Sequence, residues 1–167
     1  MEAFAGFSEF VAGRSVALSR VAYLLTGNHA TAEDLLQDAL AKAAMRWSKV
    51  SNPEAFVRKV MYRQAISIWR KRRRLREEPV AEPPEQGGYE VSENVIRQLL
   101  LELALERLTP RQRAVLVLRF YEDRSVSEAA ELLGCSEGTV KSQTAHALQR
   151  LRELAPELGD VAKEVTR

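Results

Sequence analysis

The stretch that decides the fold is SVSEAAELLGCSEGTVKSQTAHALQRLR, residues 125–152. It begins with Ser125 and has Glu128 three residues later, a pattern that matches the capping box at the start of a helix. Gly134 follows the apolar positions of that helix and can adopt the left-handed conformation that ends one. Ser136 is then placed to cap a second helix, whose apolar residues recur at steps of three and four. The stretch therefore predicts two short helices joined by a tight turn.

This pair of helices is typical of a helix-turn-helix, in which the second helix enters the major groove of DNA. A helical hairpin packed only for stability is the alternative, but it does not explain Gly-Thr-Val-Lys-Ser at the start of the last helix. The side chains left outside that helix, or at its edges, are mostly small or polar. They are Glu137, Thr139, Lys141, Ser142, Ala145, His146 and Gln149.

Two further helices are expected before this unit. The segment SENVIRQLLLELALERL, residues 92–108, has the leucine-rich pattern of a helix. In the segment that follows, Thr109 is an N-cap, Pro110 occupies the first helical position and Gln112 completes a capping box. The C-terminal part of the chain is thus predicted to be helical up to the end of the helix-turn-helix.

The N-terminal part of the chain also has helical periodicity. We expect a first helix capped by Ser8 and ending near Gly27, and a second opened by the capping box TAED, residues 31–34. Trp47 closes the second helix, and Pro53 suits the first turn of a third. One face of this third helix is apolar. Its residues are Phe56, Val57, Val60, Met61, Ala65, Ile68 and Trp69.

The third helix carries an unusual concentration of positive charge. Nine Lys and Arg residues lie between Arg58 and Arg76, and Glu54 is the only acid in the same helix. A solvated charged face is the alternative, but one acid is too few for a surface laced with salt bridges. Bases at this density beside aromatic residues suit phosphates and unstacked nucleic-acid bases. Tyr62 is expected to lie off the apolar face and is the candidate for stacking on a base.

A change of composition divides the chain. Residues 77–95 contain six glutamates and no Lys or Arg, together with three prolines and two glycines. This composition cannot bury enough apolar area to fold, so an extended linker is expected. We therefore predict an all-α fold of two small helical domains, with a flexible acidic linker and a tail. The boundaries are 1–76, 77–93 for the linker, 94–155, and 156–167 for the tail. The sequence leaves open whether the linker is a solvated tether or imitates the charge of a nucleic acid.

The composition excludes several classes of function. The single cysteine, Cys135, excludes an internal disulfide and fits a reducing compartment, while a net charge of +2 indicates no partner. The chain has no apolar run of the ~20 residues that span a bilayer and no signal-peptide pattern at its start. We therefore expect no membrane insertion and a cytoplasmic location. No metal-ligand spacing or nucleophile arrangement is present, so we expect neither enzyme activity nor a cofactor.

With these segments in this order, the whole chain resembles the extracytoplasmic-function (ECF) sigma factors of bacterial RNA polymerase, in their actinobacterial SigE-like branch. The resemblance covers roughly residues 5–152. The matching segments are AEDLLQDALAKAAMRW at 32–47, NPEAFVRKVMYRQAISIWRKRRR at 52–74 and LTPRQRAVLVLRFYEDRSVSEAAELLGCSEGTVKS at 108–142. The resemblance implies that the chain directs core polymerase to specific promoters.

The resemblance assigns the first domain to sigma region 2 and the second to region 4. Region 2 would bind the clamp helices of the polymerase β′ subunit through Asp34, Leu36, Gln37 and Asp38. It would also melt the minus-ten promoter element, and its candidate residues there are Ser48, Lys49, Ser51, Asn52, Arg58, Lys59, Tyr62 and Arg63. Region 4 would bind the β flap and read the minus-thirty-five element. Its candidate residues are Ser136, Glu137, Thr139, Lys141, Ser142, Gln143, His146 and Arg150. An anti-sigma factor is a further candidate partner.

Some positions depart from the family pattern. The family often has arginine at the position of Gln143 and another base at His146, so Lys141 and Arg150 are the main cations of the recognition helix. Asparagine is common around the position of Arg63. The main alternative function is a stand-alone helix-turn-helix regulator that dimerises through its first domain and protects a palindrome without polymerase. A protein-binding adaptor would leave the basic stretch unexplained.

Overall fold

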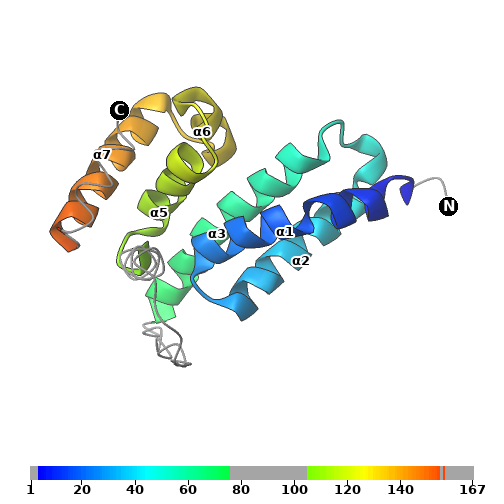
Figure 1. The fold of residues 1–167 in the computed structure, drawn as a ribbon, viewed down its shortest axis with the longest axis horizontal. Coiled ribbons are helices and arrows are strands. Elements are labelled where there is room, and N and C mark those ends of the chain that lie inside the picture. Colours follow the sequence, from blue (N-terminus) through cyan, green and yellow to red (C-terminus); the bar gives the residue numbers. More distant parts are fainter. Residues whose placement is uncertain (1–3, 76–104, 155, 157–167) are drawn as a thin grey trace, which may run out of the picture.

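The computed structural model describes residues 4–75, 105–154 and 156, and every regular element in these ranges is helical. Two groups of helices lie beside each other (Figure 1). The first consists of α1 (Phe7–Thr26), α2 (His29–Met45) and α3 (Pro53–Leu75), and the second of α5 (Pro110–Leu116), α6 (Val126–Leu133) and α7 (Glu137–Leu154). A 3-10 turn at Trp47–Lys49 precedes α3, and a π-helical turn at Val117–Tyr121 continues α5.

This architecture confirms the all-α prediction for the described residues. Pro53 is the first residue of α3, as its fixed backbone angle favours. The predicted linker at 77–93, most of the helix expected at 92–108 and nearly all of the predicted tail lie outside the described residues.

The capping residues of α5 and α6 act as the sequence predicts. Ser125 Oγ accepts a hydrogen bond from Glu128 N at 3.1 Å, and the Glu128 carboxylate accepts one from Ser125 N at 2.8 Å. Thr109 and Gln112 form the same pair of bonds, each 3.2 Å long. Gly134 ends α6 with a φ of 68°, the left-handed conformation that favours glycine. These local interactions define where the helix-turn-helix begins and where it turns.

Two helix starts lie upstream of their predicted positions. The first helix has Gly6 as its N-cap, so Ser8 lies inside the first turn. The second begins at His29, because the Asn28 side chain accepts a hydrogen bond from Thr31 N at 3.0 Å. An N-cap satisfies a backbone donor two or three residues further on, and Asn28 supplies that acceptor upstream of the predicted box. The predicted box therefore lies within the body of α2.

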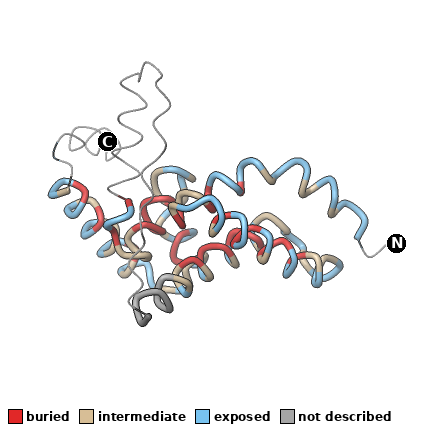
Figure 2. The backbone as a smooth tube through the Cα atoms, turned by 90° about the horizontal axis from the view of Figure 1, so that it is seen from below, coloured by how far each residue is buried: buried red, intermediate tan, exposed pale blue. Residues whose placement is uncertain are grey.

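One hydrophobic core joins the two groups of helices. Its buried residues come from both groups and include Leu35, Met61, Leu118 and Val140, each at most 1% exposed. A smaller cluster packs α5 against α7. Figure 2 shows the buried residues concentrated where the helices meet, whereas the N-terminal part of α1 is largely exposed. Helix α3 contacts α5 and α6, so the two predicted domains lie against each other, a contact that no sequence pattern indicated.

Candidate nucleic-acid interface

Two side chains hold the connection between α2 and α3 in place. Trp47 donates from Nε1 to the Ala5 carbonyl at 2.7 Å and packs edge-on against Phe7, which ties the connection to the start of α1. Asn52 is exposed and caps α3, because its Oδ1 accepts a hydrogen bond from Ala55 N at 3.1 Å. The cap engages Oδ1 and leaves the amide nitrogen of Asn52 able to donate outward. The connection therefore presents polar groups from an anchored backbone.

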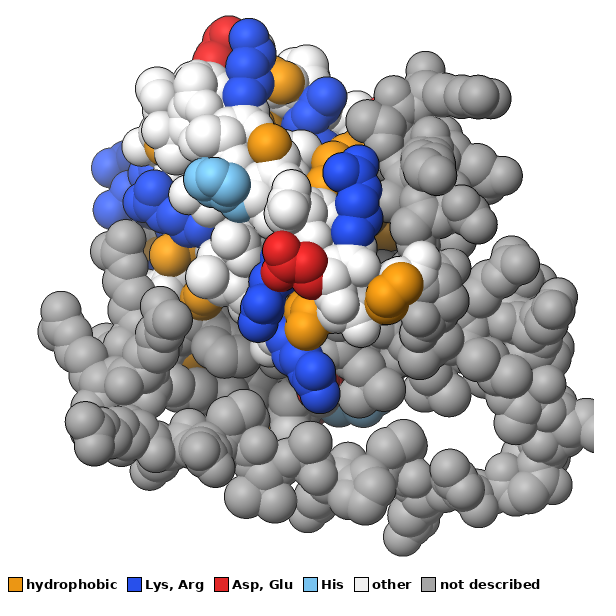
Figure 3. All heavy atoms as spheres, turned by 90° about the vertical axis from the view of Figure 1, so that its left-hand side faces the viewer, with side chains coloured by type: hydrophobic (Ala, Val, Ile, Leu, Met, Phe, Trp, Pro, Cys, Tyr) orange, Lys and Arg blue, Asp and Glu red, His pale blue; other side chains and the backbone are white. Residues whose placement is uncertain are grey.

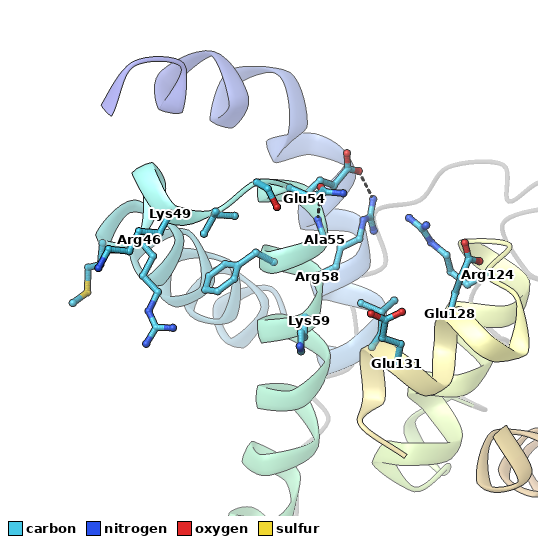
Figure 4. Close-up of a pocket in the computed structure, with 15 residues that line it drawn as sticks. Arg46, Lys49, Glu54, Ala55, Arg58, Lys59, Arg124, Glu128 and Glu131 are labelled. Carbon is cyan, nitrogen blue, oxygen red and sulfur yellow. Dashed lines mark hydrogen bonds and ion pairs between the residues drawn. The ribbon is translucent and has the colours of Figure 1, made fainter. Parts of the chain in front are cut away.

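A cleft of about 940 Å³ opens beside this connection, between α3 and α6 (Figure 4). Five of the predicted minus-ten residues line it from the side of the first group. They are Lys49, Ser51, Asn52, Arg58 and Lys59. The facing wall contributes Arg124, Glu128 and Glu131. Ser48 is exposed on the connection but does not line the cleft. Tertiary packing thus gathers most of the predicted minus-ten set opposite charged residues of the second group.

Arg58 and Tyr62 are buried between the two groups. Arg58 is 8% exposed and forms ion pairs with Glu54, at 2.9 Å, and with Glu122 of the second group. Tyr62 is fully buried, and its hydroxyl donates to Glu122 Oε2 at 2.5 Å. Burial raises the pKa of Tyr62, so the hydroxyl stays a neutral donor. In this arrangement Tyr62 is not available to stack on a base, because the second group covers an additional face of α3, beyond the predicted apolar one.

Arg63 is exposed but also reaches the second group. Its Nε donates to the Leu132 carbonyl at 3.3 Å, near the C-terminal end of α6. The guanidinium lies beside Gly134, where an added Cβ would come within 3.0 Å of it. Lys59 is exposed and has no ion pair within the described ranges. The side chains of the basic run from Arg70 onward lie outside the described part of the structure.

Helix α7 turns most of its predicted DNA-binding residues away from its packed side. Its Val140, Ala147 and Leu151 are buried, and the helix packs against α5 and α6. Figure 3 shows the end of the molecule at which α7 lies, where separate Lys and Arg side chains lie among mostly uncharged surface, with an acidic side chain between them. The exposed members of the predicted set are Ser136, Glu137, Lys141, Ser142, His146 and Arg150, and Thr139 and Gln143 are half-buried.

Several of these polar groups are already engaged within the helix. Ser136 Oγ accepts from Thr139 N at 3.1 Å, which confirms Ser136 as the cap of α7. Arg150 pairs with Glu153 at 3.5 Å. Lys141 has no ion pair among the residues that the structure describes. It is therefore the cation of the predicted recognition surface that is most available to a partner.

The four residues predicted to face the polymerase differ in their exposure on α2. Asp34 and Gln37 are exposed, whereas Leu36 is 5% exposed and belongs to the core. Asp38 accepts a hydrogen bond from Gln64 of α3 at 2.5 Å. That bond is the main cause of a lowered pKa of Asp38. A partner of α2 would therefore meet Asp34 and Gln37 first, because Asp38 is tied to α3 and Leu36 is inside.

Sequence reasoning missed the residues that the second group places against the first. Glu122 contacts both Arg58 and Tyr62, and Arg113 is 2% exposed and donates from Nε to the Leu24 carbonyl. The local signal is a set of charges after an apolar run, VLRFYEDRS at 117–125. An ordinary solvated turn has the same pattern, so only the packing of the two groups shows what these residues do.

Two family models match this arrangement. Residues 14–75, which include Lys49, Asn52 and Lys59 of the cleft, match Sigma-70 region 2. Residues 104–153, which include the helix-turn-helix, match Sigma-70, region 4. The chain belongs to the sigma-70 family of RNA polymerase sigma factors. From here on, α1–α3 are called region 2 and α5–α7 region 4.

Known sigma factors align with most of this chain. It is 41% identical to the RNA polymerase sigma-E factor of Streptomyces coelicolor over 150 residues, covering 88% of this chain and 84% of that protein. It is 32% identical to the ECF sigma factor SigL of Mycobacterium tuberculosis over 149 residues, 85% of this chain and 84% of that one. Identity to SigV of Bacillus subtilis is 30% over 138 residues, 80% and 81% of the two chains. These similarities place the sigma factor in the ECF group, beside the actinobacterial sigma-E factors.

Two solved structures share the fold of this sigma factor. RpoE of Bartonella quintana, solved with the anti-sigma factor NepR, has a TM-score of 0.66 and 28% identity over 90% of this chain and 96% of that chain. SigJ of Mycobacterium tuberculosis has a TM-score of 0.58 and 26% identity over 89% and 53% of the chains. The ECF sigma factor described here is thus an alternative sigma factor that directs transcription from promoters. Among its described residues, no acidic, His or Cys cluster suits a metal ion and no helix could cross a membrane.

Replacing Asp38 by Asn should lower the free energy of unfolding at neutral pH. The loss should stay below about 1 kcal/mol, because the carboxylate is 44% exposed and screened by solvent. The pKa of Asp38 is lowered in the folded chain by the bond from Gln64 and by Lys42, so its stabilisation is present above the ordinary pKa. It is lost as the pH falls through the lowered value.

Urea unfolding of wild type and Asp38→Asn at several pH values measures this effect. The difference between them should shrink below roughly pH 4, near the ordinary pKa of aspartate. Asp34→Asn is the control, because Asp34 is exposed and has no ion pair within the described ranges. A difference between wild type and Asp38→Asn that does not change with pH would contradict the prediction.

Proposed function

We propose that this sigma factor reads the minus-ten element with region 2 and the minus-thirty-five element with region 4, while core RNA polymerase holds both regions. The observation that carries the proposal is the presence of two separate polar surfaces, the cleft beside Asn52 and the outer face of α7. The cations of the cleft lie among three glutamates, and Arg150 on α7 is paired with Glu153, so each surface alone would bind DNA weakly. Binding both elements through one scaffold makes the second contact effectively intramolecular, which raises the overall affinity.

Region 4 supports the upstream contact through the first turns of α7. Residues near the N-terminus of a recognition helix reach base edges in the major groove. Lys141 and Ser142 lie there and are exposed. Arg150 lies further along the helix and is partly engaged by Glu153. Lys141 is therefore the proposed principal contact with the minus-thirty-five element.

Region 2 supports strand capture through a division of roles. Lys49, Arg58, Lys59 and Arg63 offer positive charge for phosphates of the single strand. An extruded base needs a polar partner, because unstacking it costs a few kcal/mol. The amide nitrogen of Asn52 can donate to the edge of such a base while its Oδ1 caps α3. In this proposal Asn52 therefore captures the extruded base by donating a hydrogen bond to its edge.

The proposed protein partners follow from the exposed surfaces of the two regions. Asp34 and Gln37 of α2, with the partly exposed Asp38, form the proposed contact with the β′ clamp helices. Region 4 is the proposed partner of the β flap. An anti-sigma factor is a further proposed partner, because the similar RpoE was solved with one. In this proposal the protein works in the cytoplasm beside polymerase, binds no cofactor and performs no chemical step itself.

Run-off transcription tests the function directly. Core RNA polymerase with this protein should produce transcripts from a subset of a genomic promoter library, whereas core enzyme alone should not. A stand-alone helix-turn-helix regulator would instead protect a palindromic site in the absence of polymerase. Such protection, without transcripts from the reconstituted holoenzyme, would overturn the proposal.

Asn52→Ser should impair promoter melting more than initial attachment. Serine is about as good an N-cap as asparagine, so α3 keeps its cap, but the amide donor is lost. Permanganate reactivity of melted thymines and run-off yield on duplex DNA measure the defect. A template pre-opened by a mismatch bubble over the minus-ten element should restore the yield, because the base is already extruded.

Asn52→Ala separates the two roles of this residue. It removes the cap as well as the amide, so it should also lower the free energy of unfolding by about 1 kcal/mol. If the serine variant melts duplex DNA as well as wild type and only the alanine variant fails, Asn52 is a cap alone. Base capture would then belong to other residues.

Lys141→Ala should reduce transcription from promoters that depend on the minus-thirty-five element. A contact with a base should cost about 1–3 kcal/mol and relax specificity at one position. A contact with phosphate alone should give a similar loss on every upstream sequence and a smaller dependence on salt. Run-off yields on promoters with varied upstream elements distinguish the two.

Arg152→Ala is the matched control for Lys141→Ala. Arg152 is an exposed cation on the same helix but outside the predicted contact set. Its removal should change upstream recognition little. Equal losses in the two variants, or no loss in Lys141→Ala, would mean that α7 does not dock through the predicted face.

A further inference from the structure

Two predicted minus-ten residues are bound by region 4 in this structure. Arg58 forms a buried ion pair with Glu122, and Arg63 donates to the Leu132 carbonyl at 3.3 Å. Tyr62, a third member of the predicted set, donates to Glu122 at 2.5 Å. Region 4 therefore occupies side chains that the proposed function assigns to the DNA strand.

Glu122 binds two side chains of the predicted minus-ten set. Its side chain is 5% exposed and accepts from both Arg58 and Tyr62. Both partners belong to region 2, so the carboxylate serves the contact between the regions rather than the internal fold of region 4. A carboxylate that accepts from a guanidinium and a hydroxyl offers the same sign of charge and the same kind of acceptor atoms as a phosphate.

Two further arginines bind the ends of helices in the opposite region. The last carbonyls of a helix lack partners and carry the negative end of its dipole, so they suit a cation. Arg63 lies at the end of α6, beside Gly134. Arg113 donates to the Leu24 carbonyl near the end of α1, and its guanidinium is 3.0 Å from where a Cβ on Gly27 would lie. Arg63 thus reaches from region 2 to region 4, and Arg113 reaches from region 4 to region 2.

We propose that region 4 covers the minus-ten residues of α3 in the free sigma factor, with Glu122 as an internal substitute for DNA phosphate. The inference rests on the proposed minus-ten role of Arg58 and Arg63. The single strand and region 4 compete for the same donors, so the strand binds the open arrangement. The apparent affinity for the strand is then reduced by the fraction of molecules that are open.

Arg58 keeps an ion-pair partner when the two regions separate. Glu54 pairs with Arg58 at 2.9 Å from within α3, and it also pairs with Arg14 of α1 at 3.3 Å. Arg58 therefore stays ion-paired and oriented when Glu122 withdraws into water. Permanent packing of one core is the opposing explanation. The shared apolar core favours the closed arrangement. The buried charges of Arg58 and Glu122 oppose it, because both regain hydration when the regions separate, and this offset favours a reversible contact.

Region 4 covers only one of the two proposed promoter contacts, the contact with the minus-ten element. Helix α7 packs against α5 and α6, and its proposed DNA-binding face is exposed while the regions are closed. Region 4 can therefore meet its own partner before region 2 is uncovered. Docking of region 4 elsewhere then removes Glu122 from Arg58 and makes the strand-binding residues available.

Glu122→Gln in the full chain tests whether this carboxylate holds region 4 over α3, because the substitution removes the charge and keeps the size of the side chain. Glu106→Gln is the matched control, since Glu106 precedes α5, is exposed, lies outside the cleft lining and has no ion pair among the described residues. Spin labels at Ser67→Cys in α3 and Ser127→Cys in α6, in a Cys135→Ser background, report the distance between the regions. Both serines are exposed.

The distribution of distances between the spin labels should become longer and broader in Glu122→Gln and remain as in wild type in Glu106→Gln. Tyr62→Phe removes only the hydroxyl that Glu122 binds and should shift the distribution in the same direction. Circular dichroism checks that each variant keeps its helices. Unchanged distances in both Glu122→Gln and Tyr62→Phe would overturn the proposal, because the two regions would then be held together without this contact.

Binding of single-stranded DNA tests whether region 4 masks the proposed minus-ten residues of α3. The probe is a fluorescein-labelled single strand with the non-template minus-ten segment of a promoter obtained by run-off transcription. Glu122→Gln should bind it about fivefold more tightly than wild type, or more, the lower end of common coupling effects. Glu106→Gln should bind it as wild type does. An equal gain in both variants would show a general effect of charge and would overturn masking by Glu122, as would no gain in either.

Arg58→Ala added to Glu122→Gln separates this inference from the proposed function. The double variant should lose the gain in affinity if Arg58 holds the strand. If it binds as tightly as Glu122→Gln, the minus-ten role of Arg58 is wrong, and with it the idea that Glu122 replaces phosphate. The distances between the spin labels are measured without DNA. They therefore decide independently whether Glu122 holds the regions together.

Discussion

Arg58 and Glu122 are buried where region 2 meets region 4, and neither charge is stable there without a partner. Removing one member of a buried ion pair typically costs several kcal/mol, because the other charge stays away from water. The placement of α3 against region 4 is therefore linked to this pair and to Tyr62, which donates to the same carboxylate. Glu54 makes the link reversible from the side of region 2, because it remains beside Arg58 in either arrangement.

Residues that begin helices also lie at the proposed DNA contacts. Asn52 caps α3 beside the cleft, and Ser136 caps α7 at the start of the recognition helix. A helix start combines unsatisfied backbone donors with the positive end of the helix dipole, so it suits both a capping oxygen and a nearby phosphate. Structural and functional roles therefore coincide at these positions. Substitutions that keep the cap, such as serine at Asn52, are needed to separate them.

Much of the fold could be predicted because its signals are local. The capping boxes at Ser125 and Thr109, the left-handed Gly134 and the start of α3 at Pro53 each depend on residues a few positions apart. The failures were also local, as at the second helix, where the side chain of Asn28 caps first. The exposed face of α7 followed from helical spacing, since that helix is buried on the side that the apolar residues define.

The sequence by itself determined the helices, the helix-turn-helix, the two-region order and the polar residues of the connection between α2 and α3. Those features depend on hydrogen bonds within a turn and on the periodicity of apolar side chains. Tertiary structure alone decided that Tyr62 and Arg58 are buried and that Glu122 binds both. Spacing along α3 predicts one buried face, whereas burial of a second face depends on a group about sixty residues away. A partner at that separation leaves no periodic signal in either segment, so only the packed chain shows which charges meet.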